Sequence, residues 1–218
     1  MDSTRAAGGY IGDDATPQRT NSTSLPALAE SSGPPPPSFA PAQLAQFSST
    51  IGAQIFAAAH TKLNDKSARE QSGESLIGFC LSRATDPLPP RGWSFGASIL
   101  ELEGSNKGKA NVLNEVDEPR AGDGESSCEL RGKLSLTSPA LAVIVFHDTK
   151  FKHNLSTSRV GSAERPLIAI VAAWDSKKRK VKTIEVASSG SVEEGAHRME
   201  DLKSGKVAVW RVLPRDVV

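Results

Sequence analysis

The chain of 218 residues is poor in cysteine, in aromatic residues and in long apolar runs. Two cysteines are too few for a disulfide framework or a zinc cage built from cysteines, and we expect both to be small buried side chains. No run approaches the roughly 18 consecutive apolar residues of a membrane-spanning helix, and the amino end lacks the apolar core of a secretion signal. We therefore expect an intracellular protein that does not engage a membrane.

The composition changes along the chain and predicts three regions. Residues 1–41 contain 27 Ala, Gly, Pro, Ser or Thr residues, and their apolar surface is too small to offset the entropy of ordering. They are expected to form a disordered arm. Residues 42–72 are expected to form an amphipathic helix followed by a linker, and residues 73–218 are expected to form a β-sandwich domain.

The helix of the second region is indicated by apolar residues that recur at spacings of three and four between Pro41 and Asn64. The apolar face is formed by Leu44, Phe47, Ile51, Ile55 and Ala58. That face either packs on the helix's own domain or contacts another subunit or a partner.

Beyond Gly73 the apolar pattern changes to short runs separated by Gly, Pro, Asn and Ser, which is typical of strands. Strands are predicted at residues 76–83, 93–102, 110–116, 128–137, 141–148, 167–174, 181–187 and 206–213. The fifth and sixth are apolar on both faces and should be central, and a β-bulge is expected near Ile99. Residues 149–165 are expected to form a polar loop, and a short helix is expected between Gly190 and Lys206. The fold class is therefore expected to be all-β: an antiparallel, jelly-roll-like β-sandwich with a disordered arm and one amphipathic helix.

The most specific local signal is a basic cluster between the sixth and seventh predicted strands. Its members are Lys177, Lys178, Arg179, Lys180 and Lys182, and a supporting basic surface is predicted from Lys150, Lys152, Arg159 and Arg165. Three interpretations, which do not exclude one another, stay open: a solvated hairpin tip, a surface for nucleic-acid phosphates, and a nuclear-import signal read by an import receptor. Residues 145–182 are strongly basic while residues 101–129 are acidic, so the near-neutral total hides an uneven charge distribution.

Signatures of catalysis are weak, and we expect no enzyme, no cofactor and no metal. Strand spacing separates His147 from His153 by about 20 Å, so only a sharp turn would let both bind one metal ion. Cys80 could pair with His60, His147 or His197 as nucleophile and base, but no nucleophile motif surrounds it.

Taken together, the arm, the helix, the eight predicted strands and the basic hairpin resemble the single jelly-roll coat proteins of small positive-strand RNA plant viruses, such as the ourmiavirus-like coats. The resemblance covers the chain in outline. It implies a self-assembling capsid protein of the virion, whose partners are further copies of itself and RNA bound without sequence preference. The arm of that family is usually rich in arginine, but here it holds only Arg5 and Arg19, so RNA contact would fall to residues 145–182.

The alternative is a nuclear or cytoplasmic β-sandwich adaptor. Its arm would offer short Pro-rich contacts, such as Pro34 to Pro37, and its basic hairpin would be the import signal. The first hypothesis places the protein in virions and in the host cytoplasm or nucleus, and the second places it in the nucleus or cytoplasm of its own cell.

Overall fold

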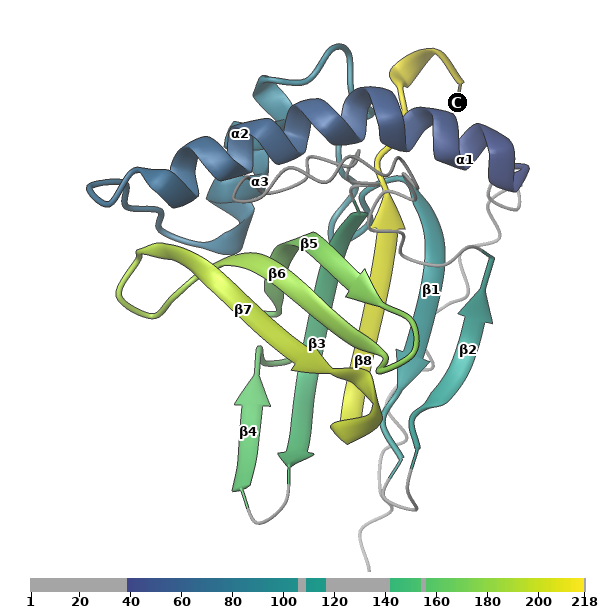
Figure 1. The fold of residues 1–218 in the computed structure, drawn as a ribbon, viewed down its shortest axis with the longest axis vertical. Helices are drawn as coiled ribbons and strands as arrows, with labels where there is room; N and C mark the ends of the chain where they lie inside the picture. The colour runs from purple at the N-terminus through teal and green to yellow at the C-terminus, as the bar shows by residue number, and fades with distance from the viewer. Residues whose placement is uncertain (1–38, 106–108, 117–141, 154–155, 218) are drawn as a thin grey trace, which may run out of the picture. The chain divides into compact units, whose positions relative to one another are not determined.

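The computed structural model describes, within one compact unit that begins at Pro36, residues 39–105, 109–116, 142–153 and 156–217 (Figure 1). Nearly all of the predicted arm and the predicted strand at residues 128–137 lie outside the described residues. No helix in the described ranges is long and apolar enough to cross a membrane.

The described strands form one antiparallel sheet. They are β1 (Ala97–Glu103), β2 (Asn111–Glu115), β3 (Ala142–His153), β4 (Ser156–Val160), β5 (Leu167–Asp175), β6 (Lys180–Val186), β7 (Val192–Arg198) and β8 (Leu202–Arg211). Their order is β2-β1-β8-β3-β5-β6-β7, and β4 pairs with the far end of β3. The prediction of an antiparallel, β-dominated fold is confirmed. The described strands form one continuous sheet, and the layer that packs on it consists of helices rather than of a second sheet. The two stacked sheets of a jelly roll are therefore not found among the described strands.

The two faces of the sheet bury two different apolar clusters. On β3, Val143 and Val145 belong to the cluster beneath the helices, whereas Ile144 and Phe146 belong to the cluster on the opposite face. The neighbouring strand β5 alternates in the same way. A strand covered on both faces must be apolar at every position, so the prediction that these two strands are central is confirmed.

The sheet curls around the cluster that faces away from α2 and α3. This cluster takes residues from β1, β3, β5, β6 and β8, and Leu100 and Leu102 line a small recess together with Trp174 and Arg179. Strands that are distant in the sheet order therefore approach each other, as the strong twist of antiparallel sheets allows.

One long helical segment lies across the other face (Figure 1). It consists of α1 (Pro41–Phe47), a π-helical turn, η1 (Ser48–Gly52), and α2 (Ala53–Asn64), which confirms the predicted amphipathic helix. The extra residue of a π turn rotates the following side chains about the helix axis. Leu44 accordingly joins one apolar cluster while Ile51 and Ile55 join the other, so the helix packs on its own sheet.

The predicted strand at residues 76–83 is wrong, because this segment forms the helix α3 (Gly73–Ser82). Ser72 caps it: the Ser75 N–H donates to Ser72 Oγ at 3.3 Å, and the Ser72 N–H donates back to Ser75 Oγ. Leu76, Ile77 and Cys80 are buried, at a spacing that also fits a helix. A short apolar run does not distinguish a buried strand from a buried helix by its period alone.

The edges of the sheet also differ from the prediction. The expected polar loop at residues 149–165 contains the end of β3 and all of β4, and β7 was not predicted. The expected short helix is the single turn η2 (Met199–Asp201), and a second turn, η3 (Arg215–Val217), lies near the carboxyl end. The bulge near Ile99 is confirmed, since the pairing of β1 with β8 shifts between Ser98 and Leu100.

Candidate functional site

The basic cluster that the sequence singles out occupies the β5–β6 turn and the start of β6. Lys177, Lys178 and Lys182 are exposed, and the Lys178 N–H donates to Asp175 Oδ1 at 3.0 Å. The turn itself is therefore as predicted. Its binding to RNA or to an import receptor stays a prediction.

The supporting basic residues separate into two groups. Lys150 and Lys152 on β3 and Arg159 on β4 share one hairpin, where Arg159 Nη2 lies 2.6 Å from Asp148 Oδ1. Arg165 lies in the β4–β5 loop, where its backbone N–H donates to Ser162 Oγ at 2.9 Å.

A polar pocket of about 380 Å³ opens between the β3–β4 hairpin and the β6–β7 hairpin. We call it the β7 pocket, and its polar lining is His153, Ser158, Lys180, His197, Arg198 and Asp201. Only Lys180 of these was predicted as a site residue. Recognition of β7 would have revealed His197 and Arg198, and the run Ser188-Ser189-Gly190-Ser191 was the available turn signal.

A partly buried hydrogen-bond network includes His197 of the pocket lining. His197 Nε2 lies 3.0 Å from Glu185 Oε2, and the Thr183 hydroxyl donates to the same oxygen at 2.6 Å. The imidazole of His197 also packs on the ring of Phe146, with 4.6 Å between centroids. Burial raises the pKa of Glu185, but the hydrogen bonds from His197 and Thr183 outweigh it, and the pKa lies below its usual value.

Gly195 makes room for this network. It is the Cα partner of Thr183 in the β6–β7 ladder, and a Cβ at this position would collide with Glu185 Oε2 and Thr183 Oγ1. The carboxylate of Glu185 therefore occupies the space that a side chain on β7 would fill, which directs it to His197.

The remaining charges of the pocket are distributed unevenly. His153 Nδ1 and Asp201 Oδ2 are 3.2 Å apart, so each of the two carboxylates at the pocket, Glu185 and Asp201, has a histidine partner. Lys180 and Arg198 are Cα partners across β6 and β7. Within the ranges that the structure describes, neither of these cations forms an ion pair.

Cys80 lies outside this pocket, in the cluster beneath the helices. Its exposed fraction is 0%, and burial, reinforced by the charge of Glu70, raises the pKa of its thiol to about 12. His197 belongs to the opposite face of the sheet, against Phe146, and His60 packs on Phe56 with 4.4 Å between ring centroids. The structure therefore brings neither histidine to the thiol, and Cys128 lies outside the described residues.

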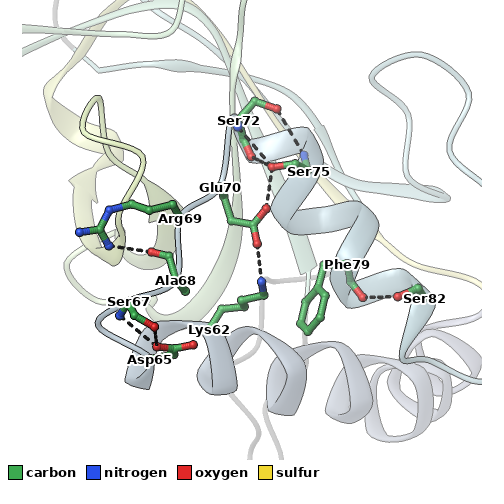
Figure 2. Close-up of polar contacts among 10 residues, drawn as sticks. All are labelled: Lys62, Asp65, Ser67, Ala68, Arg69, Glu70, Ser72, Ser75, Phe79 and Ser82. Carbon is green, nitrogen blue, oxygen red and sulfur yellow. Dashed lines mark hydrogen bonds and ion pairs between the residues drawn. The ribbon is translucent and has the colours of Figure 1, made fainter.

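A polar network connects the α2–α3 loop to both helices, and Figure 2 shows it. Lys62 Nζ lies 2.7 Å from Glu70 Oε1 and 4.3 Å from the centroid of the Phe79 ring, while the Ser75 hydroxyl donates to Glu70 Oε2 at 2.8 Å. The hydrogen bond from Lys62 lowers the pKa of Glu70 more than its modest burial raises it. Both carboxylate oxygens and the ammonium are engaged, so this network holds α3 against α2 and offers no free base.

A second recess, of about 360 Å³, is apolar and lies along α3. Its lining includes Ile77, Gly78, Leu81, Phe95 and Trp93, the last of which is 37% exposed. For metals, the described residues contain no group of three or more His, Cys, Asp or Glu side chains that could hold an ion.

Comparison with known proteins identifies the family. The family model described as the AIM3/BBC1 cysteine proteinase-fold domain matches residues 29–124 and 142–218, which is most of the chain, and the chain belongs to this family. No curated protein and no solved structure matches it.

The prediction of a viral coat protein is therefore wrong, together with its capsid and virion roles, because the matching family is one of eukaryotic cellular proteins. The resemblance rested on the arm and on a count of eight strands, and one of those eight is the helix α3. Strand number is a weak guide to function because many unrelated proteins share it.

Proposed function

We propose that this chain is a non-catalytic member of the cysteine proteinase-fold family and that it acts by binding a segment of another protein. The observation that carries the proposal is the burial of Cys80, the cysteine of the described core. A cysteine nucleophile reacts as the thiolate, and reactive cysteines lie in exposed, electropositive surroundings.

The thiol of Cys80 has the opposite surroundings. A pKa of about 12 leaves roughly one thiol in 10⁵ ionised at pH 7. Carbon side chains of α2, α3 and the sheet surround it, and they exclude a substrate as well as water. These properties are typical of a small core residue.

The binding role is supported by the β7 pocket. It is open to solvent, polar and flanked by β7, which stands at the end of the sheet order. The outer edge of such a strand presents backbone N–H and C=O groups that an extended peptide can pair with. A recess of this kind next to a strand edge is suited to recognition of a peptide.

The test of non-catalysis uses the full chain and its Cys80→Ala variant. Both are assayed with a panel of fluorogenic peptide and ester substrates, and Cys80 is followed by mass mapping during treatment with iodoacetamide. We expect equal background turnover from the two proteins, and alkylation of Cys80 only after unfolding in guanidinium. Turnover that is present in the natural chain and lost in Cys80→Ala would overturn the proposal.

A further inference from the structure

We infer that the apolar recess along α3 is a second binding site, which takes a proline-rich segment of a partner protein that carries a basic residue beside its prolines. The recess, of about 360 Å³, lies between α3 and the loop that leads from α3 to β1. Among the described residues that line it, Glu74 is the only charged one. The site is separate from the β7 pocket, and the inference does not depend on the role proposed for that pocket.

A tight turn holds Trp93 at the recess. The Arg91 N–H donates to the Ser94 carbonyl at 3.0 Å, and the Ser94 N–H donates to the Arg91 carbonyl at 3.1 Å. Gly92, the first of the two residues between them, has a φ of 59°, which glycine adopts without strain. The backbone that carries the exposed indole is therefore fixed before a ligand arrives, which limits the entropy lost on binding.

Gly78 keeps the α3 side of the recess open. It lines the recess, and nothing lies within 4 Å of a Cβ placed at this position. From Glu74 to Leu81, which also line it, the helix rises by about 10 Å. A polyproline II segment covers that length with about three residues, which is one turn of its helix.

The scarcity of polar groups in the lining favours proline over other extended segments. A peptide backbone that enters an apolar recess leaves its N–H groups without acceptors, and an unpaired buried N–H is unfavourable. Proline has no N–H, and a polyproline II segment is already extended before it binds. Proline-rich ligands dock in aromatic-lined grooves, and Trp93 supplies here an aromatic face and an N–H donor for a peptide carbonyl.

Glu74 determines the sign of the charge that the partner should carry. It lies in the first turn of α3, it is exposed, and it forms no ion pair with any residue that the structure describes. A lysine or arginine beside the prolines would be attracted to this carboxylate, and an acidic residue would be repelled.

The experiment measures binding of fluorescent peptides to the full chain by anisotropy. The reference set has the core Pro-Pro-x-Pro-Pro with arginine at both ends and a degenerate central position. Matched sets replace the prolines with alanine or the arginines with glutamate. We expect the alanine set to bind at least tenfold more weakly than the reference set, and the glutamate set about threefold more weakly. High salt should remove the second difference and leave the first.

Two variants locate the peptide on the recess. Gly78→Leu places a side chain in the open space, and Trp93→Ala removes the exposed aromatic ring. Each should lose at least tenfold in affinity for the reference set, whereas Trp93→Phe should keep most of the affinity. The thermal midpoint of Gly78→Leu should be unchanged or higher, because leucine forms helices better than glycine, and this excludes misfolding as the cause.

A third variant tests the charge. Glu74→Gln should abolish the difference between the arginine and glutamate sets. The matched control is Glu164→Gln, which removes an exposed carboxylate from the β4–β5 loop and should keep that difference. Equal binding of the arginine and glutamate sets to the natural chain would refute the basic character of the partner.

Four further results would overturn the inference. Equal binding of the reference and alanine sets would show that the recess does not recognise proline. Full binding by Gly78→Leu would place the peptide elsewhere on the protein. Tighter binding of an amphipathic helical peptide would assign the recess to a helix, and self-association that Gly78→Leu abolishes would assign it to a second copy of the chain. None of these results concerns Cys80 or the β7 pocket, so the proposed function would stand.

Discussion

At Gly195 the absence of a side chain determines where a charged group of the neighbouring strand lies. The Glu185 carboxylate occupies the position of the missing Cβ, so Gly195→Ala must displace the carboxylate or move the strand. We expect the substitution to lower the free energy of unfolding by about 1–3 kcal/mol, as overpacking of a filled site does. Chemical denaturation measures this change. In NMR spectra of the same sample, the substitution should also shift the resonances of His197.

The matched control for this prediction is Gly78→Ala. Gly78 lies within α3, and nothing is within 4 Å of a Cβ placed there. Alanine should therefore raise the free energy of unfolding by about 0.5–1 kcal/mol, because glycine is the poorer helix former. Destabilisation of similar size at both positions would contradict the role given to the space at Gly195.

Glu185 also makes the stability of the protein depend on pH. Its pKa is lower in the folded protein than the usual value of 4.5, so its contribution to stability is fully present above pH 4.5. That contribution is lost as the pH falls through the pKa of the folded state. Glu185→Gln should therefore show a shallower loss of stability below pH 4.5 than the natural chain in urea titrations. Glu194→Gln, which removes an exposed carboxylate of β7 that lies opposite Ile184 and on the other face from Glu185, should keep the natural acid dependence.

Among the elements, α3 is where the sequence pattern and the structure differ most. Its apolar run fits either a strand or a helix, and the information that decides is the reciprocal pair of hydrogen bonds between Ser72 and Ser75. Ser72→Ala should lower the free energy of unfolding by about 1 kcal/mol, since it removes the acceptor of an N-terminal N–H. Ser82→Ala, near the carboxyl end of the same helix, removes only an exposed bond to the Phe79 carbonyl and should change stability by less than half as much. Equal effects would show that the cap is unimportant.

The predictable elements share one physical property. The long helix, the two central strands and the bulge at Ile99 each bury a periodic set of apolar residues, and burial is what periodicity reports. β4 and most of β7 are exposed edge strands with polar residues on both faces, so no period marks them. The β7 pocket is built on such a strand. Of its polar lining the sequence therefore predicted only Lys180 as a site residue, through charge clustering.

At the scale of the whole molecule, the described members of both apolar clusters lie after position 38, and the composition of residues 1–41 predicts an arm with too little apolar surface to form a core. Removal of residues 1–35 should consequently leave the thermal midpoint of the remaining chain within about 2 °C of the full-length value, since a change of 1 kcal/mol shifts a domain of this size by only a few degrees.

Leu44→Ala is the informative contrast. Leu44 is 1% exposed, and its backbone oxygen accepts a hydrogen bond from buried Arg211 at 3.1 Å. This truncation should cost about 2–5 kcal/mol. A shortened chain as unstable as Leu44→Ala would mean that residues 1–35 belong to the folded core.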